Sequence, residues 1–281
     1  MSWLLLLSIN VVAISVASLF QRLAMKEEES DPVLSTIIFQ FLLGLIVLPF
    51  AISQGFSFPP LATMWPLFLL STVLYALGSV MFFKSIKLIE ASEMTVLAGA
   101  GAIVTMICAY IFLGERLVPQ QYLGAAFVLA AILIIAHRGK KFVFNKGALL
   151  ALLATSFFSF AVVSDTLIIR SYDAISFAAM MSLFPGVMLL FLYPKKILQL
   201  PKAIKTINKN LIIYTMFYSV GVITFYGALG KGAMLSQVGV VVKTNIILTV
   251  ILAAIFIKEN DHLWRKVIAA LICMVGVMLV A

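Results

Sequence analysis

The chain alternates between long apolar runs and short breaks that contain charged residues or proline. Each run is continuously apolar and does not alternate with a period of two, which is typical of a membrane-crossing helix and excludes a barrel strand. A bilayer core about 30 Å thick requires about 20 apolar residues per helix. On this criterion the sequence predicts ten spans, approximately at residues 2–24, 33–53, 64–86, 92–113, 119–137, 146–169, 175–193, 211–230, 234–257 and 263–281.

The second half of the chain repeats the first. The segment 109–115 recurs as 253–259, so that Glu115 matches Glu259 at an offset of 144 residues, and Thr105 matches Thr249 in the same frame. A duplicated unit with an odd number of spans must point its second copy the opposite way, and inverted repeats are typical of alternating-access carriers. We therefore expect an all-α integral membrane protein with ten transmembrane helices, arranged as 5+5 inverted repeats (1–145 and 146–281) around a central cavity.

The amino-acid composition excludes a soluble globular protein and a disordered one. The chain is 63% hydrophobic and 11% charged, with a mean hydropathy of +1.16, whereas soluble proteins are about 45–50% apolar and about 25% charged. This excludes a soluble or disordered chain and makes the lipid bilayer the expected partner. The net charge is +9, and the basic residues occur singly or in short loops between apolar runs. No nucleic-acid partner is therefore expected. Cys108 and Cys273 fall inside apolar runs, where no disulfide or metal site is implied.

The basic residues are distributed unevenly between the two sets of loops. Arg116, Arg170 and Lys231 are the only ones in the breaks after the even-numbered spans. Because Lys and Arg are retained on the cytoplasmic side, the other loops are predicted to be cytoplasmic and both termini extracytoplasmic, in the inner or plasma membrane of the cell. The basic residues of those loops are Arg22, Lys26, Lys84, Lys87, Arg138, Lys140, Lys141, Lys146, Lys195, Lys196, Lys202, Lys205, Lys209, Lys258, Arg265 and Lys266.

One basic residue, Lys243, lies near the middle of the ninth span and is followed by Thr244 and Asn245. A charge at this depth is costly and usually functional. The matching positions of the first copy, 99–101, hold only small residues. Two interpretations remain open: the ammonium faces the cavity and pairs with an anionic group of the substrate, or it is neutralised by Asp165 of the sixth span.

Other polar residues inside the spans are candidates for the substrate-binding site. Asp165 matches Gln21 of the first copy, which favours a shared cavity, although Asp165 could also be an interfacial residue beside Arg170. A buried amide or phenol needs a hydrogen-bonding partner, so each such residue either joins helices or faces the substrate. The residues in question are Asn10, Gln40, Tyr75 and Tyr226, and Phe82, Phe83 and Phe225 nearby would form an aromatic wall for a flat substrate.

Several chemistries are not indicated by the sequence. It contains no phosphate-binding loop, no cluster of residues with metal-ligand spacing and no arrangement typical of a catalytic triad. We expect no enzyme activity, no catalytic residue, no metal and no cofactor. The expected function is secondary active transport of a small metabolite, an amino acid or another small, anionic solute, by alternating access and in the outward direction. The alternatives are a multidrug or cation efflux antiporter and a non-transporting scaffold or receptor. Coupling to protons or other ions, and a monomeric or homodimeric state, are left open.

The ends of the two fourth spans carry a family resemblance. They read Ile-Phe-Leu-Gly-Glu-Arg (111–116) and Ile-Phe-Ile-Lys-Glu-Asn (255–260), and Gln121 and Gly124 follow the first of them. This pattern resembles the EamA-type carriers of the drug/metabolite transporter superfamily. The resemblance implies a basket in which helices 1–4 and 6–9 surround the cavity, with helices 5 and 10 at the side. It also implies transport of amino acids or other small metabolites. The second copy departs from the pattern, with Arg265 and Ile268 in place of the glutamine and glycine. Members of the family are described with cytoplasmic termini, whereas the loop charges predict the reverse.

Overall fold

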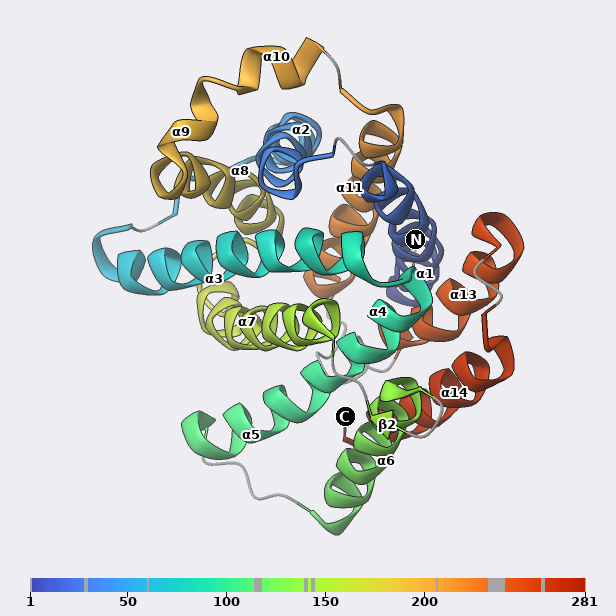
Figure 1. Cartoon of the computed structure of the whole chain (residues 1–281). Helices are drawn as coiled ribbons and strands as arrows, with labels where there is room; N and C mark the ends of the chain where they lie inside the picture. Colours follow the sequence, from blue (N-terminus) through green and yellow to red (C-terminus); the bar gives the residue numbers. More distant parts are fainter. Residues whose placement is uncertain are drawn as a thin grey trace.

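The computed structural model describes residues 2–27, 30–59, 61–113, 118–138, 141–142, 145–205, 207–231, 241–258 and 261–280. Nearly all of these residues are helical (Figure 1). The α-helices are α1 (Trp3–Lys26), α2 (Pro32–Ser53), α3 (Leu61–Leu88), α4 (Ala91–Leu97), α5 (Gly101–Leu113), α6 (Pro119–Ala136), α7 (Lys146–Ile169), α8 (Ala174–Leu192), α9 (Pro194–Ile197), α10 (Leu200–Lys205), α11 (Lys209–Gly230), α13 (Asn245–Leu252) and α14 (Leu263–Val280). A 3-10 turn, η1 (Ala98–Ala100), joins α4 to α5, and a π-helical turn, η2 (Ala253–Ile257), follows α13. Two short antiparallel strands, β1 (His137–Arg138) and β2 (Lys141–Phe142), follow α6.

Within the described ranges, six helices are long and apolar enough to cross a membrane: Trp3–Lys26, Pro32–Ser53, Met64–Leu88, Lys146–Ile169, Ala174–Leu192 and Lys209–Gly230. Shorter apolar helices cover Ala91–Thr105, Pro119–Ile135 and Val241–Ile257. The predicted helical, multi-pass membrane character is therefore confirmed. The count of ten spans stays a prediction, because the helices at the predicted spans 92–113, 119–137 and 263–281 are not among these six, and the first part of the predicted span 234–257 lies outside the described residues.

Asp31 fixes the start of α2. Its Oδ1 accepts hydrogen bonds from the backbone N–H groups of Val33 (2.9 Å) and Leu34 (3.1 Å), and Pro32 occupies the first helical position. This is a favoured helix start, since it satisfies amides that lack an intrahelical partner. Lys196 also donates to Asp31 Oδ2 at 2.5 Å. Burial alone would raise the pKa of Asp31, but the hydrogen bonds from Lys196 and from the backbone, with the charge of Lys196, bring it below its ordinary value.

The long helices pack in four main pairs. α1 lies along α11, α3 along α7, α2 against α8, and α6 against α14 (Figure 1). The largest core clusters fill the spaces between these pairs, one between α1, α2 and α11 and another around α6 and α14. Segments from the two halves of the sequence therefore alternate throughout the bundle.

The connections after α1, α3, α6 and α8 meet at one side of the bundle, here called the basic side. Lys87 Nζ donates to the carbonyl oxygen of Ser30 at 2.5 Å, which joins the end of α3 to the α1–α2 connection. Ser85 Oγ donates to the carbonyl oxygen of Gly147 at 2.8 Å, which joins α3 to the start of α7. The ion pair between Lys196 and Asp31 brings α9 to the same place. The structure thus places on one side most of the described loops that carry the Lys and Arg excess.

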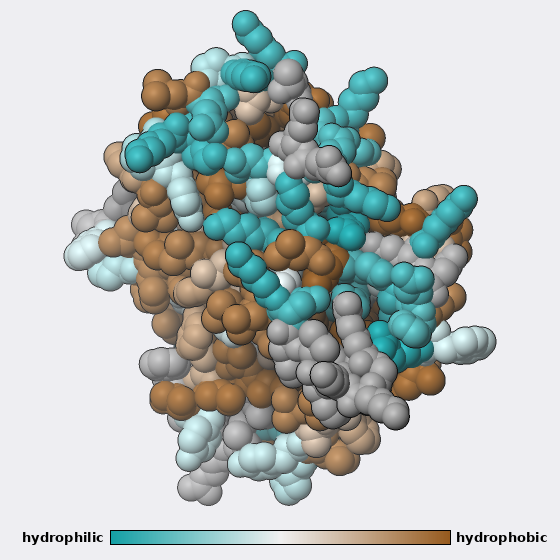
Figure 2. Space-filling view, in the orientation of Figure 1, coloured by the Kyte–Doolittle hydropathy of each residue, from teal (hydrophilic) through white to brown (hydrophobic). Residues whose placement is uncertain are grey.

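The opposite side is closed by the α2–α3 and α7–α8 connections. Tyr172 Oη donates to the carbonyl oxygen of Ser57 at 2.6 Å, and Ser57 N–H donates to Ser176 Oγ at 3.1 Å. Burial raises the pKa of Tyr172 to about 12. Figure 2 shows hydrophilic side chains from the top of the view, where α9 and α10 lie, down through its centre and right, and hydrophobic side chains on the left, over the left parts of α3 and α7. This separation suits a bundle whose sides contact lipid.

Candidate functional site

A cavity of about 340 Å³ lies between α1, α3, α4 and α11. Along α1 its lining runs from Asn10 to Gln21, which is roughly 16 Å at 1.5 Å per residue. The lining reaches the basic side at Ile86 and Ala91 and extends in the other direction to Tyr226. Other lining residues named below are Ser18, Phe39, Phe82, Phe83, Thr95, Phe158, Tyr214, Tyr218, Gly221, Phe225, Lys243 and Asn245.

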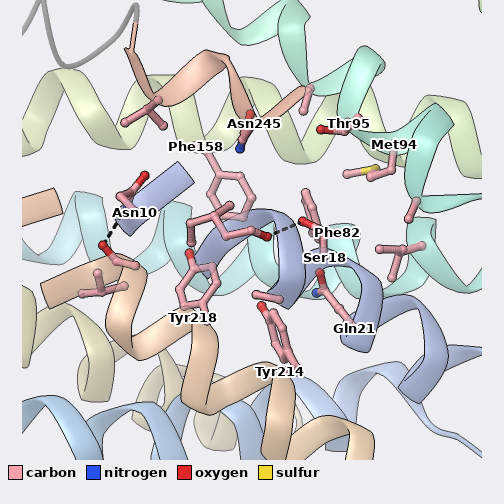
Figure 3. A pocket seen from close by; sticks show the side chains of 18 of the residues that line it. Asn10, Ser18, Gln21, Phe82, Met94, Thr95, Phe158, Tyr214, Tyr218 and Asn245 are labelled. Carbon is pink, nitrogen blue, oxygen red and sulfur yellow. Dashed lines mark hydrogen bonds between the residues drawn. The ribbon is translucent and has the colours of Figure 1, made fainter. Parts of the chain in front are cut away.

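Two buried amides in the wall have hydrogen-bonding capacity left over. Asn10 Nδ2 donates to the carbonyl oxygen of Gly221 at 2.8 Å (Figure 3), and this bond fixes the direction of the side chain. Among the described residues, neither Asn10 Oδ1 nor Gln21 Nε2 has a partner, although both atoms are buried. Leaving a buried polar atom unpaired costs about 1–3 kcal/mol. Each of these two lining residues therefore keeps one buried polar atom, an acceptor in Asn10 and a donor in Gln21, without a partner.

Lys243 and Asn245 supply a cation and a third amide from the segment that precedes and opens α13. No ion pair or hydrogen bond engages either side chain within the described part of the chain. The backbone of this segment is held instead, because Ser15 Oγ of α1 donates to the carbonyl oxygen of Asn245 at 3.4 Å. In Figure 3 the side chain of Asn245 lies across the cavity from Tyr214 and Tyr218.

The helix is interrupted at Thr244, directly beside Lys243. Residues 241–243 are helical, Thr244 forms a turn, and α13 begins at Asn245. Thr244 Oγ1 donates to the carbonyl oxygen of Val241 at 2.7 Å, so its side chain stabilises the turn and does not line the cavity. The first copy has an interruption at the matching place, since η1 covers residues 98–100 and Ala100 matches Thr244 in the repeat. Both interruptions lie beside the cavity, where Ala98 and Lys243 are lining residues.

Aromatic side chains make up most of the remaining wall. Phe39, Phe83, Tyr214 and Tyr218 form one connected group, with ring centroids 4.7 Å apart for Phe39 and Tyr214 and 5.5 Å apart for the two tyrosines. These separations are those of favourable aromatic pairs. On other walls, Phe82 contacts Phe158, and Phe225 contacts Tyr226. Phe82, Phe83 and Phe225 thus lie where the sequence predicted an aromatic wall.

Four predicted site residues do not line the cavity. Thr244 has been described above. Gln40 is buried between α2 and α3, where its Nε2 donates to Ser79 Oγ at 3.2 Å. Asp165 accepts hydrogen bonds from Ser71 Oγ at 2.9 Å and from Tyr75 Oη at 2.5 Å. In this part of the described chain, the alternative pairing of Asp165 with Lys243 is therefore not formed, and Asp165 is a buried residue, not an interfacial one.

The remaining predicted residues, Asn10, Gln21, Tyr226, Lys243 and Asn245, are brought together around the cavity. Several other lining residues were not predicted from the sequence, including Ser18, Thr95, Phe158, Tyr214 and Tyr218. A helical spacing could have found two of them, because Tyr214 and Tyr218 share one face of α11 with Gly221 and Phe225.

The helices contribute unequally to the site. No described residue of α6 or α14 lines the cavity, which agrees with the lateral position that the family resemblance implies for these two helices. α8 also contributes no described lining residue, although the resemblance implies that it surrounds the cavity. No group of acidic, histidine or cysteine side chains in the described ranges could hold a metal ion.

A duplicated helical unit around a polar and aromatic cavity can be compared with known proteins. The model of the EamA-like transporter family matches residues 1–137 and again residues 145–281. The chain belongs to the EamA-like transporter family. Membership indicates a membrane transporter of the drug/metabolite transporter superfamily. No curated protein matches the sequence. One solved crystal structure, 17% identical in sequence, aligns over 96% of this chain and 96% of its own with a TM-score of 0.64, which shows a shared fold.

Proposed function

We propose that this EamA-family protein is a secondary active transporter that moves a small, anionic or zwitterionic metabolite across the inner or plasma membrane by alternating access, in the outward direction. The observation that carries the proposal is the cavity itself. It combines an unpaired ammonium group with amides that have free hydrogen-bonding capacity and with aromatic walls. An acidic group of the substrate would pair with Lys243, its polar edge with Asn10, Gln21 and Asn245, and its flat or apolar part with the rings.

The packing of the helices supports two inverted units, 1–145 and 146–281. In the repeat, α1 corresponds to α7, α3 to α11, α2 to α8 and α6 to α14. The pair of α1 with α11 is then the counterpart of the pair of α7 with α3, while α2 and α8, and α6 and α14, pair with each other. A two-fold axis between the units would produce this exchange, and such an axis is typical of alternating-access carriers.

We also propose that the basic side is cytoplasmic and that both termini lie outside. The loop charges support this, and α1 and α14 each have their chain terminus at the end away from the basic side, as the contacts of Arg22 and Lys266 there indicate. Because the lining of the cavity reaches the basic side, the structure would then correspond to an inward-facing state. Labelling of single cysteines added at either terminus, in intact cells, tests the orientation.

A cation efflux antiporter is the less favoured function. Among the described lining residues, Lys243 is the sole lysine, arginine, histidine, aspartate or glutamate, and its ammonium form would repel a cation in a cavity of low dielectric constant. A non-transporting scaffold would require no such cavity.

The test is counterflow into proteoliposomes that contain the purified full chain. The panel should hold aliphatic and aromatic amino acids, organic acids, nucleotides and organic cations. Counterflow of an anionic or zwitterionic compound supports the proposal, and counterflow of cations alone would favour the antiporter. Absence of counterflow for every compound would favour a scaffold or receptor.

A further inference from the structure

We propose that Asp165 is a proton-binding site that couples proton movement to transport, an inference that rests on the proposed transport function. Asp165 lies near the end of α7 that is away from the basic side and is 4% exposed. Both of its oxygen atoms accept hydrogen bonds from hydroxyl groups of α3. Ser71 Oγ donates to Oδ1 at 2.9 Å, and Tyr75 Oη donates to Oδ2 at 2.5 Å.

No cation compensates this carboxyl group in the part of the chain that the structure describes. The ion pairs described there, Lys196 with Asp31 and Lys266 with Glu90, involve other acids and lie at the basic side. An isolated charge at membrane depth costs several kcal/mol. A carboxylate can avoid that cost by binding one proton to become a neutral acid. When the proton leaves, the hydroxyl groups of Ser71 and Tyr75 remain as donors to the charge. The pocket thus accommodates both forms.

The described helical elements that pack on α7 place no cation against the carboxyl group of Asp165. They are α3, α4, η1 and α5. Gly147 of α7 lies against Leu88 at the basic side, so Asp165, 18 positions further along, is roughly 27 Å from that end of the helix. The titratable side chains on α3, α4 and α5 are Tyr75, Lys84, Lys87, Glu93, Cys108 and Tyr110, and α7 itself carries Lys146, with Arg170 after its end. Lys84, Lys87, Glu93 and Lys146 all belong to the basic end of their helices, and Tyr110 and Arg170 are exposed. Of this set, Tyr75 is the group bonded to Asp165.

One layer of aromatic rings separates Asp165 from the cavity. The ring of Tyr75 lies 5.9 Å from that of Phe158, which is a lining residue. Tyr226, also a lining residue, packs with Tyr75 against one apolar cluster, to which α3, α7 and α8 all contribute. A substrate that displaces Phe158 or Tyr226 would move Tyr75 and change its hydrogen bond to Asp165. Substrate occupancy and proton occupancy would then be linked, because each would alter the free energy of the other.

The proton site can be tested without any substrate. The probe is the proton itself, read from the pH-difference infrared spectrum of the full chain in lipid vesicles, recorded in H₂O and D₂O. We expect wild type to gain a carboxylic acid C=O band on acidification, and we expect this band to be lost in Asp165→Asn. Asp173→Asn is the matched control, since Asp173 caps α8 outside the span and its loss should leave the band in place. An Asp165→Asn spectrum identical to that of wild type would overturn the proposal.

A second variant protects the test against misfolding of Asp165→Asn. Tyr75→Phe retains the carboxyl group and its packing but removes the hydroxyl donor. We expect a shift in the pH midpoint of the same C=O band, and an unchanged midpoint would argue against the proposed connection between Asp165 and the cavity.

The last test is a transport assay in proteoliposomes, which uses any compound of the panel that the wild-type protein exchanges. Wild type should accumulate the compound when a pH gradient is imposed. Asp165→Asn should retain exchange at equal pH and lose the accumulation driven by the gradient. Accumulation by Asp165→Asn, or indifference of wild type to the gradient, refutes the coupling. If wild type moves no compound at all, the transport proposal fails, while the infrared spectra still decide whether Asp165 binds a proton.

Discussion

A methyl group placed on Gly99 would lie 2.2 Å from the sulfur atom of Cys273. Gly99 belongs to η1, and Cys273 is on α14, where its Sγ lies 3.6 Å from the carbonyl oxygen of Val96 as a hydrogen-bond donor. The glycine therefore allows α14 to approach the interrupted helix closely. It is also the counterpart of Lys243 in the repeat, so that one copy uses this position for packing and the other for a charge.

We predict that Gly99→Ala destabilises the protein by about 1–3 kcal/mol, the usual cost of overpacking a filled core. Thermal unfolding of the detergent-solubilised protein measures the change. The double variant Gly99→Ala with Cys273→Ala should recover a large part of the loss, because it removes the sulfur atom from the clash. Simple additivity of the two single changes would contradict the close contact.

Lys243→Met should reduce transport or binding of an anionic panel compound by about 10- to 100-fold, as expected for the loss of a charged hydrogen bond worth about 1.5–3 kcal/mol. The change keeps an unbranched side chain one atom shorter and removes its charge, so membrane insertion should be unaffected. Lys231→Met is the matched control, because Lys231 is exposed at the end of α11. Wild-type uptake by Lys243→Met would remove Lys243 from the site.

The ion pair between Lys266 and Glu90 joins the start of α14 to the α3–α4 connection. The side chain of Lys266 is 2% exposed and that of Glu90 is 24% exposed. Breaking a buried pair from one side leaves an uncompensated charge and typically costs about 3–5 kcal/mol. We predict that Glu90→Gln lowers the thermal midpoint more than Lys266→Met with Glu90→Gln does. If the double variant is the less stable of the two, the charge of Lys266 is stabilised chiefly by its other contacts.

The cap of α2 should make stability depend on pH in the acidic range. The pKa of Asp31 is lowered in the folded protein, so its contribution is fully present above the unfolded value of 3.8 and is lost as the pH falls through the folded value. The pair with Lys196 is partly exposed, and we expect a loss of no more than about 1 kcal/mol. Asp31→Asn retains a capping residue and should weaken this pH dependence, as thermal midpoints measured along a pH series would reveal. An unchanged series would exclude Asp31 as its source.

The helices could be predicted well because charge and proline interrupt the apolar runs at their ends. The run 146–169 coincides with α7, from Lys146 to Ile169. The interruption at η1 was missed because Ala98, Gly99 and Ala100 are as apolar as their neighbours and carry no sign of a break. The short strand pair at residues 137–142 was also not predicted, since two residues per strand leave no alternating pattern to detect.

The site was harder to predict, because helices in a membrane bundle are apolar on nearly every face, and the amphipathic pattern that identifies the inner face of a soluble helix is weak. Tyr75 and Phe82 both lie on α3, yet Phe82 lines the cavity whereas Tyr75 turns toward α7. Polarity alone identified Lys243 and Asn10 as polar residues inside the spans. The direction in which each side chain points depends on the rotation of its helix, which the packing sets.

The matching interruptions at η1 and Thr244 have a mechanical consequence. A continuous helix transmits a tilt along its whole length, whereas a helix broken halfway can bend at the break. The segment α4–η1–α5 can therefore bend at η1, and the described segment from Val241 to Leu252 can bend at Thr244. Since Ala98 and Lys243 line the cavity beside these breaks, a molecule bound there lies next to both joints, and its arrival or departure can set the angle between the segments on either side.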